Sequence, residues 1–124
     1  MLHSSARKKG NSLEYDVEYS LKPIYSDIKT TERRGFAQGF DLIAEQKNTV
    51  FECKFHKSIT WNELVKIYEI LRSRTQEAVF HWVIFKTNQQ PVLVFDGKSI
   101  RLFKDIFGVE FKNRPKREKN IWTQ

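Results

Sequence analysis

Two strand-like apolar runs, joined by a short polar segment, constrain the fold of this chain more than any other feature. The first run is Phe40–Ala44 and the second is Val50–Phe55. Residues 45–49 between them are polar and turn-prone, which is typical of the connection in a β-hairpin. We therefore expect two adjacent antiparallel strands in the middle of the chain.

Three charged residues stand within these apolar runs. Glu52 and Lys54 are two residues apart, so in a strand they point to the same face. If Gln46–Lys47 form a two-residue turn, counting outward places Asp41 directly opposite Glu52, with Cβ atoms about 4.5–5.5 Å apart. Carboxylates that close repel each other unless a cation lies between them. A bulge or a longer turn would change this register.

Asp41 with the acid-x-lysine motif of Glu52 and Lys54 resembles the signature of the PD-(D/E)xK nucleases. A basic stretch ending in glycine, Arg7–Gly10, precedes a helix that bears Glu14, and this order is similar to that of the archaeal-type Holliday junction resolvases. The resemblance covers roughly residues 7–95. It implies an α/β fold with a restriction-endonuclease-like mixed sheet flanked by helices.

Two positions depart from the family pattern. Phe40 precedes the aspartate where the signature has proline, as in many branches of the superfamily. Phe55–His56 follow the lysine, where small or basic residues are expected in the resolvases. The second departure concerns the subfamily more than the superfamily.

The resemblance implies a catalytic role for Glu14, Asp41, Glu52 and Lys54. Asp41 and Glu52 would hold Mg²⁺, which Mn²⁺ would replace, with the backbone carbonyl of Cys53 as a third ligand. Lys54 would orient the attacking water or stabilise developing negative charge. Glu14 would bind a second metal or hold a metal-bound water.

Structural explanations compete with these roles. Glu52 and Lys54 could be solvated positions or a structural ion pair, although an acid among apolar strand residues needs a partner. Glu14 could simply cap its own helix as the N3 residue behind an N-cap at Asn11. Because Cys53 alternates with Glu52 and Lys54, we expect it to face the core and not to act as a nucleophile.

The charge balance indicates a polyanionic partner. The 124 residues carry a net charge of +7, with an isoelectric point near 9.6, which favours nucleic acid. The chain has no long apolar run or Lys-rich amphipathic helix for a membrane. Its single cysteine fits a reducing cytoplasm. Candidate DNA contacts are Arg7, Lys8, Lys9, Arg33 and Arg34, and solubilising charge is the alternative for them.

The chain is expected to consist of a basic flexible arm (1–10), one nuclease domain (11–111) and a basic tail (112–124). Within the domain, the patterns predict helices from Asn11 to about Lys22 and over residues 58–74. Further strands are expected at 78–85 and 92–95, followed by a helix or a final strand at 99–107. Residues 26–38 are expected to form a polar loop.

Other conspicuous side chains have ordinary explanations. His81 lies in a buried strand and is expected to be a hydrogen-bonded core residue, whereas His56 is expected at the surface. Trp61 and Trp82 are expected in the core rather than as platforms for stacking bases.

We therefore expect a magnesium-dependent endonuclease that cuts branched DNA, most like a Holliday junction resolvase. Such an enzyme takes part in recombination and repair, and two symmetric cuts imply a homodimer. Alternatives are a restriction-type, nicking or repair nuclease of the same superfamily, an RNA-directed nuclease, and a non-catalytic DNA-binding module.

Overall fold

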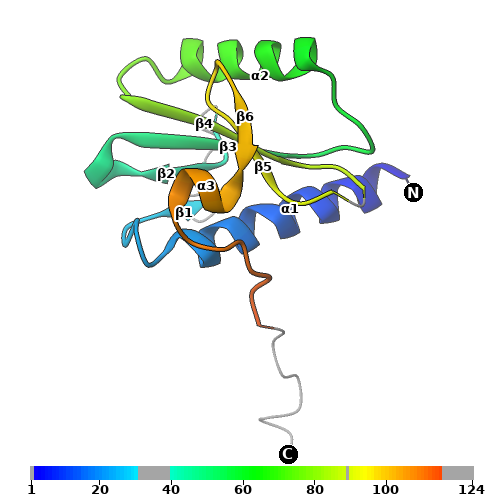
Figure 1. Cartoon of the computed structure of the whole chain (residues 1–124), viewed down its shortest axis with the longest axis horizontal. Coiled ribbons are helices and arrows are strands. Elements are labelled where there is room, and N and C mark those ends of the chain that lie inside the picture. Colours follow the sequence, from blue (N-terminus) through cyan, green and yellow to red (C-terminus); the bar gives the residue numbers. More distant parts are fainter. Residues whose placement is uncertain (1, 31–39, 89, 116–124) are drawn as a thin grey trace, which may run out of the picture.

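The molecule has three layers, with a mixed β-sheet between two helices, as shown by a computed structural model (Figure 1). The structure describes residues 2–30, 40–88 and 90–115, with side chains from Ser12 onward. The long helix α1 lies below the sheet in Figure 1 and α2 lies above it. The chain therefore has the α/β class predicted from its sequence.

Ten elements make up the described chain. In order they are α1 (Leu2–Leu21), β1 (Lys29–Thr30), β2 (Leu42–Ala44), η2 (Glu45–Lys47), β3 (Thr49–Phe55), α2 (Trp61–Arg74), β4 (Phe80–Lys86), β5 (Leu93–Phe95), β6 (Ile100–Leu102) and α3 (Phe103–Phe107).

The order of the strands in the sheet is the same as their order along the chain, from β1 to β6. Every neighbouring pair is antiparallel except β3 and β4, which are parallel. Parallel neighbours require a crossover, and α2 supplies it across one face of the sheet. This crossover places α2 over β3, the strand that carries Glu52 and Lys54.

The register between β2 and β3 is the one expected from the sequence. Leu42 pairs with Phe51 and Ala44 with Thr49. Asp41 lies just before β2 and its N–H bonds to the Phe51 carbonyl oxygen, so the expected direct pairing of Asp41 with Glu52 is not part of the strand ladder. The connection is a turn closed by a hydrogen bond from the Asn48 N–H to the Glu45 carbonyl oxygen, at 3.0 Å. Asn48 takes the left-handed conformation, with φ 49°, which asparagine tolerates better than most residues.

Hydrophobic residues cover both faces of the sheet, which explains why the strands are so apolar. The α1-side core consists of Leu13, Val17, Leu21, Ile28, Leu42, Ala44, Phe51, Cys53, Ile84, Val92, Val94, Phe103 and Phe107. The α2-side core consists of Phe40, Val50, Leu64, Leu71, Val83, Phe85 and Phe95. Phe51 and Cys53 face α1, so the alternating residues Glu52 and Lys54 lie on the α2 side.

The two long helices differ in how well their starts were predicted. Thr60 caps α2 in a capping box: its hydroxyl accepts from the Glu63 N–H and the Glu63 carboxylate accepts from the Thr60 N–H. The expected N-cap at Asn11 is wrong, because α1 begins at Leu2 and residues 2–10 have helical backbone. Asn11 offers a good N-cap side chain, but the preceding residues contain no proline to stop the helix.

The remaining elements refine the expected order. The polar segment after α1 contains the short strand β1, which has only two residues and no alternating apolar pattern to mark it. Residues 99–107 form a strand and then a helix, β6 and α3, rather than one or the other. Phe103 and Phe107 are buried, whereas Ile100 is exposed.

The aromatic and histidine side chains only partly follow expectation. His81 is buried and its Nε2 lies 2.9 Å from the Thr75 carbonyl oxygen, which confirms it as a satisfied core residue. The core assignment of Trp61 is wrong, since its side chain is half exposed and packs edge-on against Phe95. Trp82 is partly buried against the α1-side core.

Candidate functional site

Asp41 is held at the entrance to β2 by contacts to β3. Phe40, immediately before it, is buried in the α2-side core. The Asp41 N–H donates to the Phe51 carbonyl oxygen at 3.0 Å, and its Oδ2 accepts from the Cys53 N–H at 2.7 Å. These two bonds fix the carboxyl group beside the middle of β3.

Glu52 and Lys54 lie side by side on the α2 face of β3. The Lys54 Nζ is 3.4 Å from Glu52 Oε2, and the lysine and glutamate side chains are 34% and 19% exposed, respectively. Both are therefore only partly accessible to water. This contact is the ion pair that the sequence also allowed as a purely structural explanation. Whether the pair is structural or catalytic depends on which other carboxyl groups lie nearby.

Glu14 joins this group from α1, on the opposite face of the sheet. The helix is anchored by Leu13 and Val17, both buried in the α1-side core. The Glu14 and Glu52 side chains both lie close enough to Asp41 to lower its pKa. Glu14 cannot cap a helix start at Asn11, because α1 begins at Leu2.

The pKa values of these carboxyl groups show how closely the acids are crowded. Burial raises the pKa of Asp41, opposed by its hydrogen bond from the Cys53 N–H and by contacts to Glu14, Lys54 and Glu52. Burial, and then the negative charge of Asp41, raise the pKa of Glu52 to about 7, although Lys54 opposes this. Both shifts result from crowding acidic groups away from water.

Cys53 completes the description of β3 at this point. Its thiol is buried under the α1 side of the sheet, and burial together with the surrounding acids raises its pKa well above the ordinary value. A thiol that stays protonated is a poor nucleophile. The expectation that Cys53 is structural is therefore supported.

The donor chemistry of the three carboxyl groups suits a hard divalent cation, which prefers oxygen ligands. In the described part of the chain, however, no set of three or more His, Cys, Asp or Glu side chains is arranged so that it could hold a metal ion. Binding a cation would require the carboxyl groups of Glu14, Asp41 and Glu52 to lose their protons and to change their arrangement.

None of the basic side chains expected to contact DNA is among those that the structure describes. Arg33 and Arg34 lie outside the described residues, as do the side chains of Arg7, Lys8 and Lys9.

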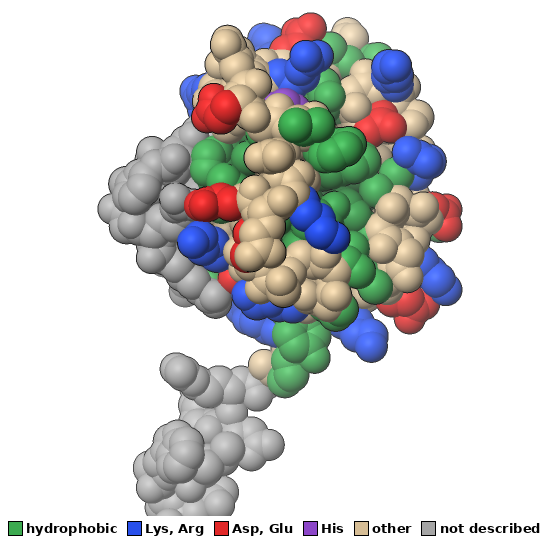
Figure 2. All heavy atoms as spheres, turned by 90° about the vertical axis from the view of Figure 1, so that its left-hand side faces the viewer, with side chains coloured by type: hydrophobic (Ala, Val, Ile, Leu, Met, Phe, Trp, Pro, Cys, Tyr) green, Lys and Arg blue, Asp and Glu red, His purple; other side chains and the backbone are tan. Residues whose placement is uncertain are grey.

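Figure 2 views the molecule from the end where the β2–β3 connection lies, and there basic and acidic side chains are interspersed around apolar ones. Val79 and Phe80, exposed by 63% and 52%, lie just before and at the start of β4.

One residue near the site was missed by the sequence reasoning. Arg74, in the last turn of α2, lines a small cavity together with Glu52 and Lys54, and its charge lowers the pKa of Glu52. Its spacing of four residues from Ile70 and seven from Ile67 places all three on one flank of the helix. That spacing could have been noticed, but the sequence does not show which strand the flank faces.

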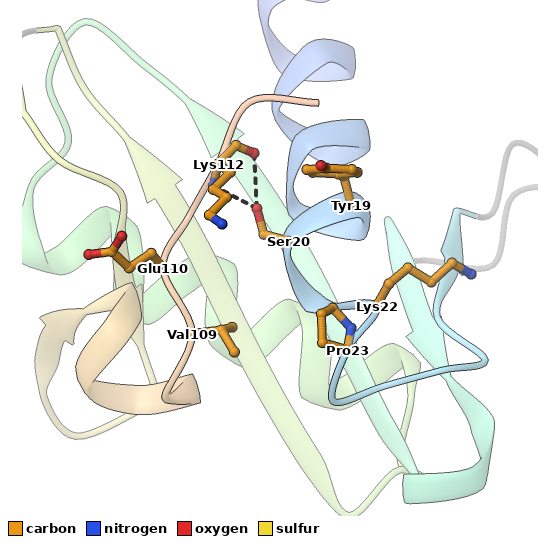
Figure 3. A pocket seen from close by; sticks show the side chains of 7 residues that line it. All are labelled: Tyr19, Ser20, Lys22, Pro23, Val109, Glu110 and Lys112. Atoms are coloured by element: carbon orange, nitrogen blue, oxygen red, sulfur yellow. Dashed lines mark hydrogen bonds between the residues drawn. The ribbon is translucent and has the colours of Figure 1, made fainter. Parts of the chain in front are cut away.

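Larger cavities lie away from the carboxyl groups. One, with a volume of about 510 Å³, lies between the end of α1 and the segment after α3. Figure 3 shows this segment running beside α1, where Ser20 Oγ donates to the Lys112 carbonyl oxygen at 3.0 Å and accepts from the Lys112 N–H at 2.8 Å. These contacts bind the segment to the helix that carries Glu14.

None of the helices in the described part of the chain is both long and apolar enough to span a membrane. Comparison with models of protein families, with curated proteins and with solved structures found no match. The function of the protein must therefore be inferred from the site formed by Glu14, Asp41, Glu52 and Lys54.

Proposed function

We propose that this protein is a metal-dependent endonuclease of the PD-(D/E)xK, restriction-endonuclease-like kind, acting on branched DNA in the manner of a Holliday junction resolvase. The observation that carries the proposal is the convergence of Glu14, Asp41 and Glu52 beside Lys54. A surface ion pair would need only Glu52 and Lys54. Three partly buried acids at one point are costly to the fold, and such perturbed groups cluster at functional sites.

The proposed chemistry assigns each group a role. A divalent cation bound by the carboxylates would supply a Lewis acid and a water made nucleophilic at neutral pH. Asp41 and Glu52 would hold it, while the hydrogen bond from the Cys53 N–H keeps Asp41 oriented. The Lys54 ammonium would stabilise negative charge developing on the phosphate. Glu14 would bind a second metal or hold a metal-bound water.

The choice of branched DNA rests on two sequence features. Lysine and arginine exceed acidic residues by 22 to 15, which favours sequence-independent contact with a phosphate backbone. In the sequence, Glu14 follows the basic stretch Arg7–Gly10, an order similar to that of the resolvases, although both lie within the single helix α1 here. Two symmetric cuts across a junction require two sites, so the proposal includes a homodimer, which light scattering in solution would test.

The decisive experiment is a cleavage assay in Mg²⁺. An immobile four-way junction is compared with linear duplex, flap, single-stranded DNA and RNA of the same sequences. Asp41→Asn and Glu52→Gln keep the side-chain shape and should each lower the cleavage rate more than about 100-fold, because each removes a charged ligand. Glu69→Gln, which changes an exposed acid on α2, serves as the matched control and should cleave like the wild type.

Each outcome identifies one function. Paired symmetric cuts on the junction alone, abolished in both variants, would support a resolvase. Cutting of another substrate, abolished in the same variants, would keep the site and change the substrate to that of a repair-type or RNA-directed nuclease. Tight junction binding without cutting would favour a non-catalytic DNA-binding module. Full cleavage by Asp41→Asn and Glu52→Gln would refute the site.

A further inference from the structure

A small cavity separates the flank of α2 from β3. It has a volume of about 150 Å³, and its lining consists of Glu52, Lys54, Ile67, Ile70, Leu71 and Arg74. Two cationic side chains, from the strand and from the helix, thus line the same cavity. The space is large enough for a compact anionic group such as phosphate.

The two cations are not in the same electrostatic situation. The Lys54 ammonium is paired with Glu52. In the part of the chain with described side chains, the Arg74 guanidinium makes no ion pair or hydrogen bond. A guanidinium has five donors in a planar fork, which matches two oxygens of a phosphate group. Arg74 therefore has its full hydrogen-bonding capacity available at this cavity.

A helix-terminal arginine has an ordinary explanation, because the helix dipole favours positive charge in the last turn. That explanation applies equally to Arg72 and Arg74, both in the last turn of α2. It does not explain why Arg74 shares a cavity with Glu52 and Lys54. Arg72 is four residues from Tyr68, which packs against Phe95 on the other flank of the helix, so it provides an internal comparison.

We propose that this cavity is an anion subsite in which Arg74 binds a phosphate group of the nucleic-acid backbone beside the carboxyl cluster. The inference rests on the proposed function and adds a positioning residue to it. Arg74 would hold the non-bridging oxygens of one phosphate from the α2 side, while Lys54 acts from the strand. Because Arg74 contacts phosphate and not a base, it would strengthen binding to all sequences equally.

The test compares Arg74→Ala and Arg74→Lys with Arg72→Ala. Binding of a fluorescent four-way junction and a duplex is measured without divalent cations over a range of salt concentrations. Removing the cation that binds one phosphate should reduce the slope of log K against log salt by about 0.9. We expect this reduction in Arg74→Ala alone. Arg74→Lys should keep the slope but bind a few-fold more weakly, since lysine cannot contact the phosphate through two parallel bonds.

A second readout does not depend on cleavage or on DNA. Inorganic phosphate is titrated into the wild-type protein while the arginine Nε–Hε resonances are followed by NMR, and the Arg74 signal is assigned by its absence in Arg74→Lys. We expect a saturable shift of that signal and a smaller one for Arg72. If Arg74→Ala fails to fold, Arg74→Lys and the titration still decide the matter.

The outcomes separate the two proposals. A wild-type protein that cuts no substrate, yet shows the Arg74-dependent slope and phosphate shift, would contradict the nuclease and keep the anion subsite. A protein that cleaves junctions, with Arg74→Ala and Arg72→Ala indistinguishable in slope, would keep the nuclease and refute the subsite. An Arg74 signal that does not respond to phosphate would also refute it.

Discussion

At the scale of single residues, the raised pKa of Glu52 makes the stability of the protein depend on pH. Its carboxyl group is partly buried and faces a second acid, so its pKa is raised from an ordinary value of 4.5 to about 7 in the folded chain. The protonated form is therefore favoured by folding. The stabilisation that protonation of Glu52 gives the folded chain is fully present below about pH 4.5 and is lost as the pH rises through about 7.

We predict that Glu52→Gln removes this pH dependence. Between pH 5 and pH 8, the wild-type protein should lose unfolding free energy on the order of 3 kcal/mol more than the variant does, because one pKa unit corresponds to about 1.4 kcal/mol. Urea denaturation at both pH values measures the difference. Equal pH dependence in the two proteins would show that Glu52 is not crowded as described.

Added Mg²⁺ tests the protonation of Glu52 in a second way. Ligand carboxylates must lose their protons before they bind a metal, so Mg²⁺ should raise the melting temperature more at pH 8 than at pH 5. The increase should disappear in Glu52→Gln and after chelation with EDTA. An increase of the same size in the variant would place the cation elsewhere.

The register of β2 on β3 could be predicted because alternation in two apolar strands and a short turn leave one register that buries both runs. The place of Glu14 depended on a family resemblance, since no local rule brings a helix residue to a strand more than twenty positions away. Arg74 could not be predicted, because its role depends on how α2 rotates over the sheet.

At the scale of elements, the segment after α3 acts on α1. The Arg114 backbone N–H and guanidinium both donate to Asp16 Oδ1, at 3.0 and 2.8 Å, and the guanidinium also donates to the Ser12 carbonyl oxygen. Its charged group lies over the Tyr15 ring. These contacts hold the turns of the helix on either side of Glu14.

We predict that Asp16→Asn weakens this attachment and lowers the unfolding free energy by about 1–2 kcal/mol, since the bond to Arg114 is charge-assisted and the Asp16 side chain is largely buried. Equilibrium urea denaturation provides the measurement. The matched control is Glu110→Gln, whose exposed pair with Lys104 should be worth less than about 0.5 kcal/mol. Similar losses of stability in the two variants would contradict the special role of this attachment.

The elements differ in how far their sequences revealed them. α2 has a capping box, an apolar face and terminal arginines, all of which act locally, and its bounds were predicted closely. β1 consists of two polar residues that form a strand only because β2 is present beside them. Trp61 lies in the first turn of α2, where its ring packs edge-on against Phe95 but stays half exposed.

At the scale of the whole molecule, the net charge of +7 governs encounter with a polyanion. We predict that replacing Arg7, Lys8 and Lys9 together by glutamine weakens junction binding and makes it less dependent on salt, by up to about 0.9 in slope for each phosphate that is no longer bound. Fluorescence anisotropy at several salt concentrations measures this. Replacing Lys57, Lys98 and Lys104 by glutamine controls for net charge, and an equal change in slope would show that the charge alone matters.

The α/β class and the hairpin follow from patterns that act over a few residues. The approach of Glu14 on α1 to Asp41, by contrast, depends on packing of the entire chain. That is why the residues of the candidate site could be named from the sequence, but their protonation and hydrogen bonds could not.

The strand order of the sheet has a consequence for how the protein is made. Each strand is adjacent to the one synthesised just before it, so during translation every new strand meets a finished edge and needs no distant partner. Such short-range pairing favours rapid folding. The attachment of Arg114 to Asp16, by contrast, joins distant parts of the chain at the end. A chain that stops before residue 114 would therefore keep α1 packed on the sheet but would lack the bonds from Arg114 that hold the turns around Glu14.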